Sequence, residues 1–152
     1  MPRLDSLPER FAELLRGLPV PELGPTPWTP SAPASELRIA VVTTAGLHRR
    51  GDRPFTLNEG DYRVLPASAR DEIVMSHLSP NVDRAGFAED VNVVFPIDRL
   101  RELKAAGEIG SLAELHYSFM GATQVDQMRE SAKELAGHLH ADGVNGVLLV
   151  PV

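Results

Sequence analysis

The chain has 152 residues, of which 43% are hydrophobic and 24% are charged, and its net charge at pH 7 is −6. This length is enough for a soluble globular domain with its own core. The negative charge argues against nucleic acid or an anionic membrane as the main partner, and no apolar run is long enough to span a bilayer. No cysteine is present, which excludes disulfides, thiolate metal sites and a thiol nucleophile within these residues. We expect a cytoplasmic protein, because the N-terminus has no secretory signal pattern.

Residues 1–36 are expected to form a helix and an arm outside the main domain. Ser6, Pro8 and Glu9 match a helix-capping sequence, with the serine as the cap. Four apolar residues then fall on one helical face: Phe11, Leu14, Leu15 and Leu18. Six of the thirteen prolines follow between residues 19 and 33, and they hold a chain extended. We expect Trp28 to pin this arm to a groove on the body, with a partner contact as the alternative.

Residues 37–152 are expected to form an α/β domain. Strands are predicted at 37–44 and 72–78, with a shorter one at 62–65 and a strand or extended segment at 91–95. Amphipathic helices are predicted at 96–107 and 123–142, the second capped by Thr123, and residues 51–61 are predicted as a loop. Strands that alternate with helices indicate a mainly parallel, Rossmann-like sheet flanked by helices. No glycine-rich dinucleotide or Walker pattern follows the first strand.

The last predicted strand, at residues 144–152, is a nearly continuous apolar run with four valines. Such a run is typical of a strand that is buried on both faces in the middle of a parallel sheet. In open parallel sheets, ligands bind just beyond the carboxyl ends of the strands. We therefore expect the chemistry of this protein to lie at that edge.

Three histidines are predicted near the carboxyl edge of the sheet. His48 follows the first strand, His77 closes the second, and His116 lies in an apolar connection. Together with Asp83 they are candidates for an acid/base or metal cluster, and the alternative is that each is a hydrogen-bonded structural histidine. No spacing matches a zinc motif, so no metal or other cofactor is expected. His138 and His140 are expected only to complement the dipole at the end of the last helix.

Several segments resemble a known family. They are Val41–His48, Arg50–Phe55, Asp61–Pro66, Glu89–Leu103, Ile109–Gly110 and His116–Gly121. In this order, from Leu37 to Val152, they resemble the glycine/sarcosine/betaine reductase and D-proline reductase family, selenoprotein B subunit, including its shorter proline-reductase-like members. The most specific segment is Glu89–Leu103.

The resemblance implies a redox enzyme. Family members carry a selenocysteine, or a cysteine, directly after a strand like Gly146–Val152, and a second cysteine follows. The selenolate or thiolate attacks the substrate, and the neighbouring thiol resolves the bond. The resemblance also implies a partner subunit with a pyruvoyl group, a thioredoxin-like dithiol donor and an oligomeric assembly. His48, His77, Asp83 and His116 lie in the matching region, and our hypothesis is that they support catalysis by positioning substrate or transferring protons, although the resemblance itself assigns them no roles.

The sequence departs from this pattern because the redox residue is not among these 152 residues. We expect Val152 to precede a UGA selenocysteine codon, so that the chain is the N-terminal part of a selenol- or thiol-dependent reductase subunit for an amino acid or amine-type substrate. The alternative is a cysteine-free, non-catalytic interaction module that docks a partner through its N-terminal helix. A metal enzyme that uses the histidines is a third hypothesis.

Overall fold

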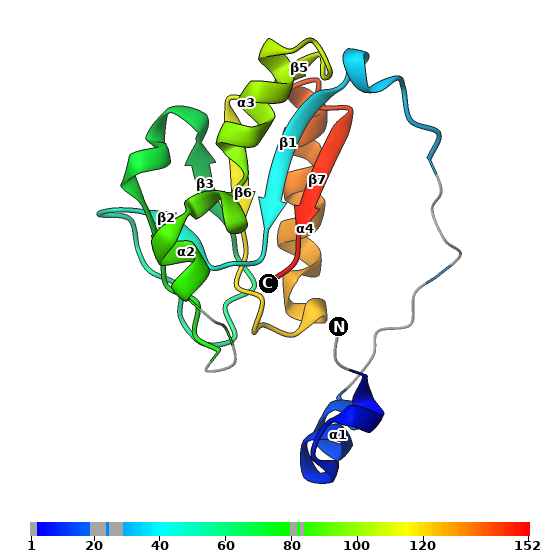
Figure 1. Cartoon of the computed structure of the whole chain (residues 1–152), viewed down its shortest axis with the longest axis vertical. Helices are drawn as coiled ribbons and strands as arrows, with labels where there is room; N and C mark the ends of the chain where they lie inside the picture. The colour runs from blue at the N-terminus through cyan, green and yellow to red at the C-terminus, as the bar shows by residue number, and fades with distance from the viewer. Residues whose placement is uncertain (1–2, 19–23, 25–28, 80–81, 83) are drawn as a thin grey trace.

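A computed structural model of the protein describes residues 3–18, 24, 29–79, 82 and 84–152 (Figure 1). The N-terminal part contains η1 (Leu4–Ser6), α1 (Glu9–Arg16) and η2 (Ala34–Glu36). The body follows with β1 (Arg38–Thr43), β2 (Leu47–Arg49), β3 (Arg63–Pro66), η3 (Ala67–Glu72), β4 (Ile73–Met75), α2 (Ala85–Glu89), η4 (Val91–Val93), α3 (Ile97–Ala105), β5 (Ser111–Leu112), β6 (Leu115–Ser118), α4 (Val125–Ala141) and β7 (Gly146–Val150). The prediction for Trp28 falls outside the described residues.

The main sheet is organised around β1, which is paired along both of its edges. On one edge β1 pairs in parallel with β7, from Ile39 opposite Gly146 to Thr43 opposite Val150. On the other edge it pairs in parallel first with β5 and then with β6, and β3 is added antiparallel to β6. The predicted fold class, an α/β domain with a mainly parallel sheet, is confirmed.

Helices cover the two faces of the sheet. One face packs against α3, and its buried residues include Val41, Phe95, Ile97 and Leu100. On the other face α4 packs through Leu135 against Tyr117 and Phe119 of the β6 segment. Figure 1 shows α4 behind β1 and β7, and it shows α1 drawn apart from the body. Within the described part of the chain, no helix is long and apolar enough to cross a membrane.

The last strand was predicted in the middle of the sheet, and that prediction is wrong. Among the described residues β7 pairs only with β1, so it is an edge strand. Its central side chains are exposed: Val147 by 44%, Leu148 by 37% and Leu149 by 69%. An apolar run indicates that a strand is suited to burial, but it carries no information on how many neighbours the strand has.

Other local predictions also need correction. Of the predicted strand at 72–78, only β4 forms, and it pairs antiparallel with β2 in a separate two-stranded sheet. The segment at 91–95 begins with the 3-10 helix η4 instead of a strand. Conversely, the apolar connection around His116 forms β6, because its backbone pairs with two strands distant in sequence.

Both predicted side-chain caps are absent. Pro8 occupies the N-cap position of α1, and the hydroxyl of Ser6 donates to the carbonyl of Arg3. Gln124 occupies the N-cap position of α4, and Thr123 instead donates to the carbonyl of Glu59 at 2.9 Å. A hydroxyl that donates to a residue distant in the sequence is not available to cap the neighbouring helix.

Candidate functional site at the carboxyl edge of the sheet

The candidate site is the edge of the sheet where β1, β6 and β7 end. These strands are parallel, so their carboxyl ends lie at one edge, and Figure 1 shows the C-terminus there. Ligands of open parallel sheets bind beyond this edge, because strand ends and the loops that follow them present free backbone and side-chain groups there.

Thr44 joins the segments that follow the three strands. Its N–H donates to the carbonyl of Val150 at 3.1 Å, and its hydroxyl oxygen accepts from the N–H of Val152 at 2.9 Å. Its carbonyl accepts from the N–H of Gly121 at 2.8 Å. A Cβ atom on Gly121 would lie 2.5 Å from the carbonyl oxygen of Val152. Residue 121 therefore has to be glycine for the three backbones to approach this closely.

The turn after β1 brings His77 to the same end of the molecule. Gly46 has a φ of +66° and lies so close to the His77 backbone that a Cβ atom would be 3.1 Å from its Cα. The N–H of Gly46 donates to the carbonyl of Phe119, and its carbonyl accepts from the N–H of Ser76, both at 2.9 Å. The backbone of Gly46 thus links the segment after β6 to the segment that carries His77.

His77 is a neutral, buried hydrogen-bond donor. Its side chain is only 3% exposed, and its Nδ1 accepts from the N–H of Ser79 at 3.2 Å. The proton is therefore on Nε2, for which no acceptor is found among the described residues. Burial lowers the pKa of His77, and the nearby charge of Arg84 lowers it further. Arg84 also donates to the carbonyl of His77. The predicted pairing of His77 with Asp83 falls outside the described residues.

His116 replaces a missing backbone partner of β1. The switch from β5 to β6 along the edge of β1 leaves the N–H of Val41 without a strand partner, and Nδ1 of His116 accepts it at 3.0 Å. The imidazole is fully buried against the ring of Phe95. Burial lowers the pKa of His116 to about 4, and the positive charge of Arg101 adds to the effect. This histidine is held in its neutral form as part of the β1 hydrogen-bond ladder.

The third histidine, His48, lies in β2. Its side chain is buried, and its Nδ1 is 2.9 Å from the carbonyl oxygen of Arg49. Across the described residues no group of three or more histidine, aspartate or glutamate side chains is arranged to hold a metal ion. Of the predicted residues that the structure describes, His77 lies beside the turn that follows β1, His48 comes just after this turn in β2, and His116 lies in β6.

A buried ion pair braces the loop beside this edge. The carboxylate of Glu59 accepts from Arg63, Arg53 and the N–H of Thr56. Burial acts to raise the pKa of Glu59, but these hydrogen bonds outweigh it and lower the pKa to about 2. Gly60 packs directly on the first turn of α4, since a Cβ atom there would overlap the carbonyl oxygen of Gln127. This ion pair was not predicted from the sequence, where the four-residue spacing of Glu59 and Arg63 was its signal.

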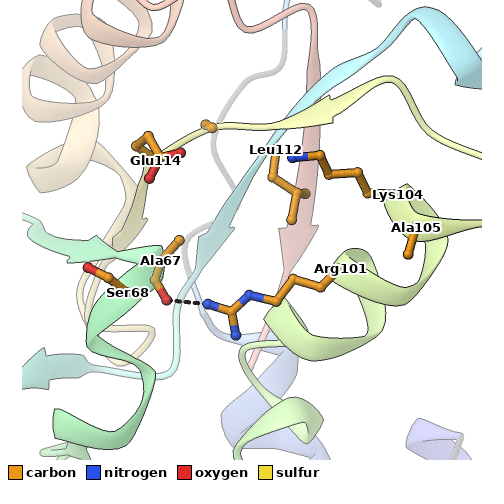
Figure 2. Close-up of a pocket in the computed structure, with 8 residues that line it drawn as sticks. Ala67, Ser68, Arg101, Lys104, Ala105, Leu112 and Glu114 are labelled. Atoms are coloured by element: carbon orange, nitrogen blue, oxygen red, sulfur yellow. Dashed lines mark hydrogen bonds between the residues drawn. The ribbon is translucent and has the colours of Figure 1, made fainter. Parts of the chain in front are cut away.

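A hollow of about 470 Å³ lies elsewhere, near the amino end of β1 where β5 pairs. Its lining residues are Ala67, Ser68, Arg101, Lys104, Ala105, Leu112, Ala113 and Glu114. Figure 2 shows Lys104 and Glu114 on opposite sides, and Arg101 donating to the carbonyl of Ala67 at 2.6 Å. The hollow is lined by charged groups and was not predicted. The spacing of Arg101 and Lys104 on one face of α3 was the only signal for it.

Comparison with known proteins shows the family to which this chain is similar. The sequence profile of the family described as glycine/sarcosine/betaine reductase selenoprotein B matches residues 18–152. The chain belongs to this family. The family match includes every strand of the sheet and begins after α1. No solved structure matches the chain significantly.

The curated relatives of this reductase-family chain are subunits of reductases. It is 35% identical over 135 residues to D-proline reductase subunit gamma of Acetoanaerobium sticklandii, which covers 86% of this chain and 55% of that protein. It is 28% identical over 138 residues to sarcosine reductase complex component B subunit beta of Peptoclostridium acidaminophilum, covering 86% of this chain and 32% of the relative. The chain thus spans between about a third and about a half of the relatives it matches.

Proposed function

We propose that these residues form the sheet scaffold of a cytoplasmic reductase subunit and that its reacting groups meet at the carboxyl edge of the sheet. The substrate class is an amino acid or amine-type compound, such as those in the names of the relatives. One observation carries the proposal. The family match runs across all the strands that converge on Thr44, Gly121 and Val152.

The redox nucleophile in this proposal is a selenol or thiol outside residues 1–152, because these residues contain no cysteine. Its anion attacks the substrate carbon that carries the nitrogen, so that a Se–C or S–C bond forms as the C–N bond breaks. A second thiol then attacks the selenium or sulfur, the carbon leaves with the electron pair and takes up a proton, and a selenenyl sulfide or disulfide remains. A thioredoxin-like dithiol then returns the two electrons by exchange. A pyruvoyl group on a partner subunit would activate an amino substrate as an imine, and no described residue is assigned to hold it.

We assign His77 the role of hydrogen-bond donor to the substrate or to an anionic intermediate. This assignment is supported by its Nε2 proton, for which the described residues offer no acceptor, by its burial and by its place beside Gly46. A neutral donor in an apolar surrounding stabilises developing negative charge. His48, Asp83 and His116 stay in the proposal as supporting residues, His116 by holding β1 in place.

The purified 152-residue chain tests the proposal. Given D-proline, glycine, sarcosine or betaine with a dithiol donor, it should give no turnover. Turnover by this chain alone would contradict the external nucleophile.

The role of His77 can be tested by measuring kcat in the assembled reductase. His77→Gln should lower kcat by about tenfold to a hundredfold, as expected for loss of a donor to developing charge. Leu78→Gln, a substitution at the adjacent exposed side chain, is the control and should keep kcat. If His77→Gln and Leu78→Gln have the same kcat, His77 has no catalytic role.

A second candidate function is a non-catalytic interaction module of the same fold. It is favoured by the exposed apolar side chains of the N-terminal segment, Phe11, Leu14 and Leu18, of which the first two lie outside the family match. The interaction module would be supported if the chain binds a pyruvoyl-type partner but gives no turnover, even when a polypeptide that carries the proposed selenol or thiol is added. Restored turnover under those conditions would support the reductase instead.

A further inference from the structure

The strand β7 is an open and unprotected sheet edge. Only β1 pairs with it among the described residues, so every second backbone N–H and C=O of β7 points outward. Natural edge strands are usually protected by charged residues, an internal proline or a bulge. From residue 144 to residue 152 there is no charged side chain, and Pro151 lies only after β7 has ended. Such an edge is a template for another strand.

The helix α4 also carries exposed apolar side chains on its β7 side. Val125, Ala132 and Ala136 are exposed and follow one another at helical spacing, so they form one stripe on α4. On the other side of Leu135, Glu134 accepts a hydrogen bond from Tyr62, the residue just before β3. Because β3 and β7 are the opposite edges of the sheet, the stripe is on the β7 side of α4. On this same face, β7 exposes Val147 and Leu149.

We propose that a second copy of this chain covers this surface, with the two β7 strands paired antiparallel about a two-fold axis. A two-fold axis perpendicular to the sheet makes the strand pair antiparallel and keeps both α4 helices on one face of the joined sheet. The uncharged segment meets only its own uncharged sequence, so no like charges oppose each other across the strand pair. The pairing satisfies the outward backbone groups and buries Val147 and Leu149 of both copies. This inference does not depend on the proposed function.

Sedimentation velocity over a wide concentration series tests the dimer. The wild-type chain should pass from monomer to dimer as concentration rises, and Leu149→Lys should stay monomeric. Leu57→Lys is the matched control, because Leu57 is also 69% exposed but lies in the loop that leads to β3. Both variants change the net charge from −6 to −5, so general repulsion cannot explain a difference. A monomeric wild-type chain, or a dimeric Leu149→Lys variant, overturns the proposal.

The cysteine-free sequence allows a second, site-specific test. Leu148→Cys places one thiol in the middle of β7, where antiparallel neighbours are close enough for a disulfide. Mild oxidation should convert this variant to covalent dimers, while Leu57→Cys should stay monomeric. Equal cross-linking at both positions, or none at residue 148, overturns the proposal. If the chain binds another polypeptide through β7 but never pairs with a second copy of itself, the proposal is overturned and β7 is the binding edge for that polypeptide.

Discussion

At the scale of single residues, His116 is the side chain that most clearly connects protonation to folding. Its Nδ1 lone pair accepts the N–H of Val41, so a proton on that nitrogen would face another proton. The pKa of about 4 in the folded chain is below the ordinary value of 6.5, which the unfolded chain should show. The unfolded state therefore takes up the proton first as the pH falls.

We predict that the free energy of unfolding decreases as the pH falls from 6.5 toward 4. His116 should account for about 3 kcal/mol of this loss, because one pKa unit corresponds to about 1.4 kcal/mol. His77 adds to it in the same direction, since its pKa is also lowered. Urea unfolding at several pH values measures the effect. His116→Asn should reduce this pH dependence relative to the wild-type chain, and an unchanged slope would contradict the prediction.

Gly121 gives a residue-scale prediction on geometry alone. In Gly121→Ala the new methyl group would meet the carbonyl oxygens of Val152 and Thr44 at 2.5 and 2.9 Å, so the backbone must move. We expect a loss of about 1–3 kcal/mol in the free energy of unfolding. Gly137→Ala, inside α4 with open space around it, should instead raise stability by up to about 1 kcal/mol. Changes of the same sign would refute the close approach at Gly121.

At the scale of elements, the loop between β2 and β3 depends on the Glu59 ion pair. Glu59 and Arg63 have side chains only 9% and 10% exposed, so neither charge is well solvated without the other. Glu59→Gln should lower the free energy of unfolding by about 2–4 kcal/mol, because it leaves the buried charge of Arg63 uncompensated.

The matched control for this ion pair is Glu130→Gln, which removes an exposed pair with Lys133. Its effect should stay below about 1 kcal/mol. The Glu59 contribution should also be lost in acid, from pH 4.5 down toward 2, because the folded-state pKa is lowered to about 2. A Glu59→Gln variant as stable as Glu130→Gln would show that the brace does not stabilise the fold.

At the scale of the whole molecule, the N-terminal segment and the body are expected to unfold independently. Figure 1 shows α1 apart from the sheet, and the family match begins only at residue 18. Deleting residues 1–33 should therefore change the Tm of the body by no more than about 2 °C, a shift that corresponds to a fraction of a kcal/mol. Calorimetry measures this shift. A large drop in Tm would mean that α1 packs on the body and that the boundary near residue 36 is wrong.

The sequence by itself determined the local elements whose pattern is strong. The β-branched run before Thr44 formed β1, and the amphipathic patterns formed α3 and α4 within a few residues of the predicted bounds. Periodicity and turn residues act over one helical turn or one strand, so they are readable without tertiary contacts. The resemblance to the reductase family was also available from the sequence, and the comparisons confirm it.

Only the tertiary structure decided how these elements meet. It put β7 at an edge, made a strand of the segment around His116, and used Thr123 and His116 for contacts with distant residues. It also brought His77 beside Gly46, although it did not gather the three histidines around one centre. Strand neighbours and buried hydrogen-bond partners are chosen by contacts between residues far apart in the chain. A local pattern shows that a strand or a polar group needs a partner, but not which partner it finds.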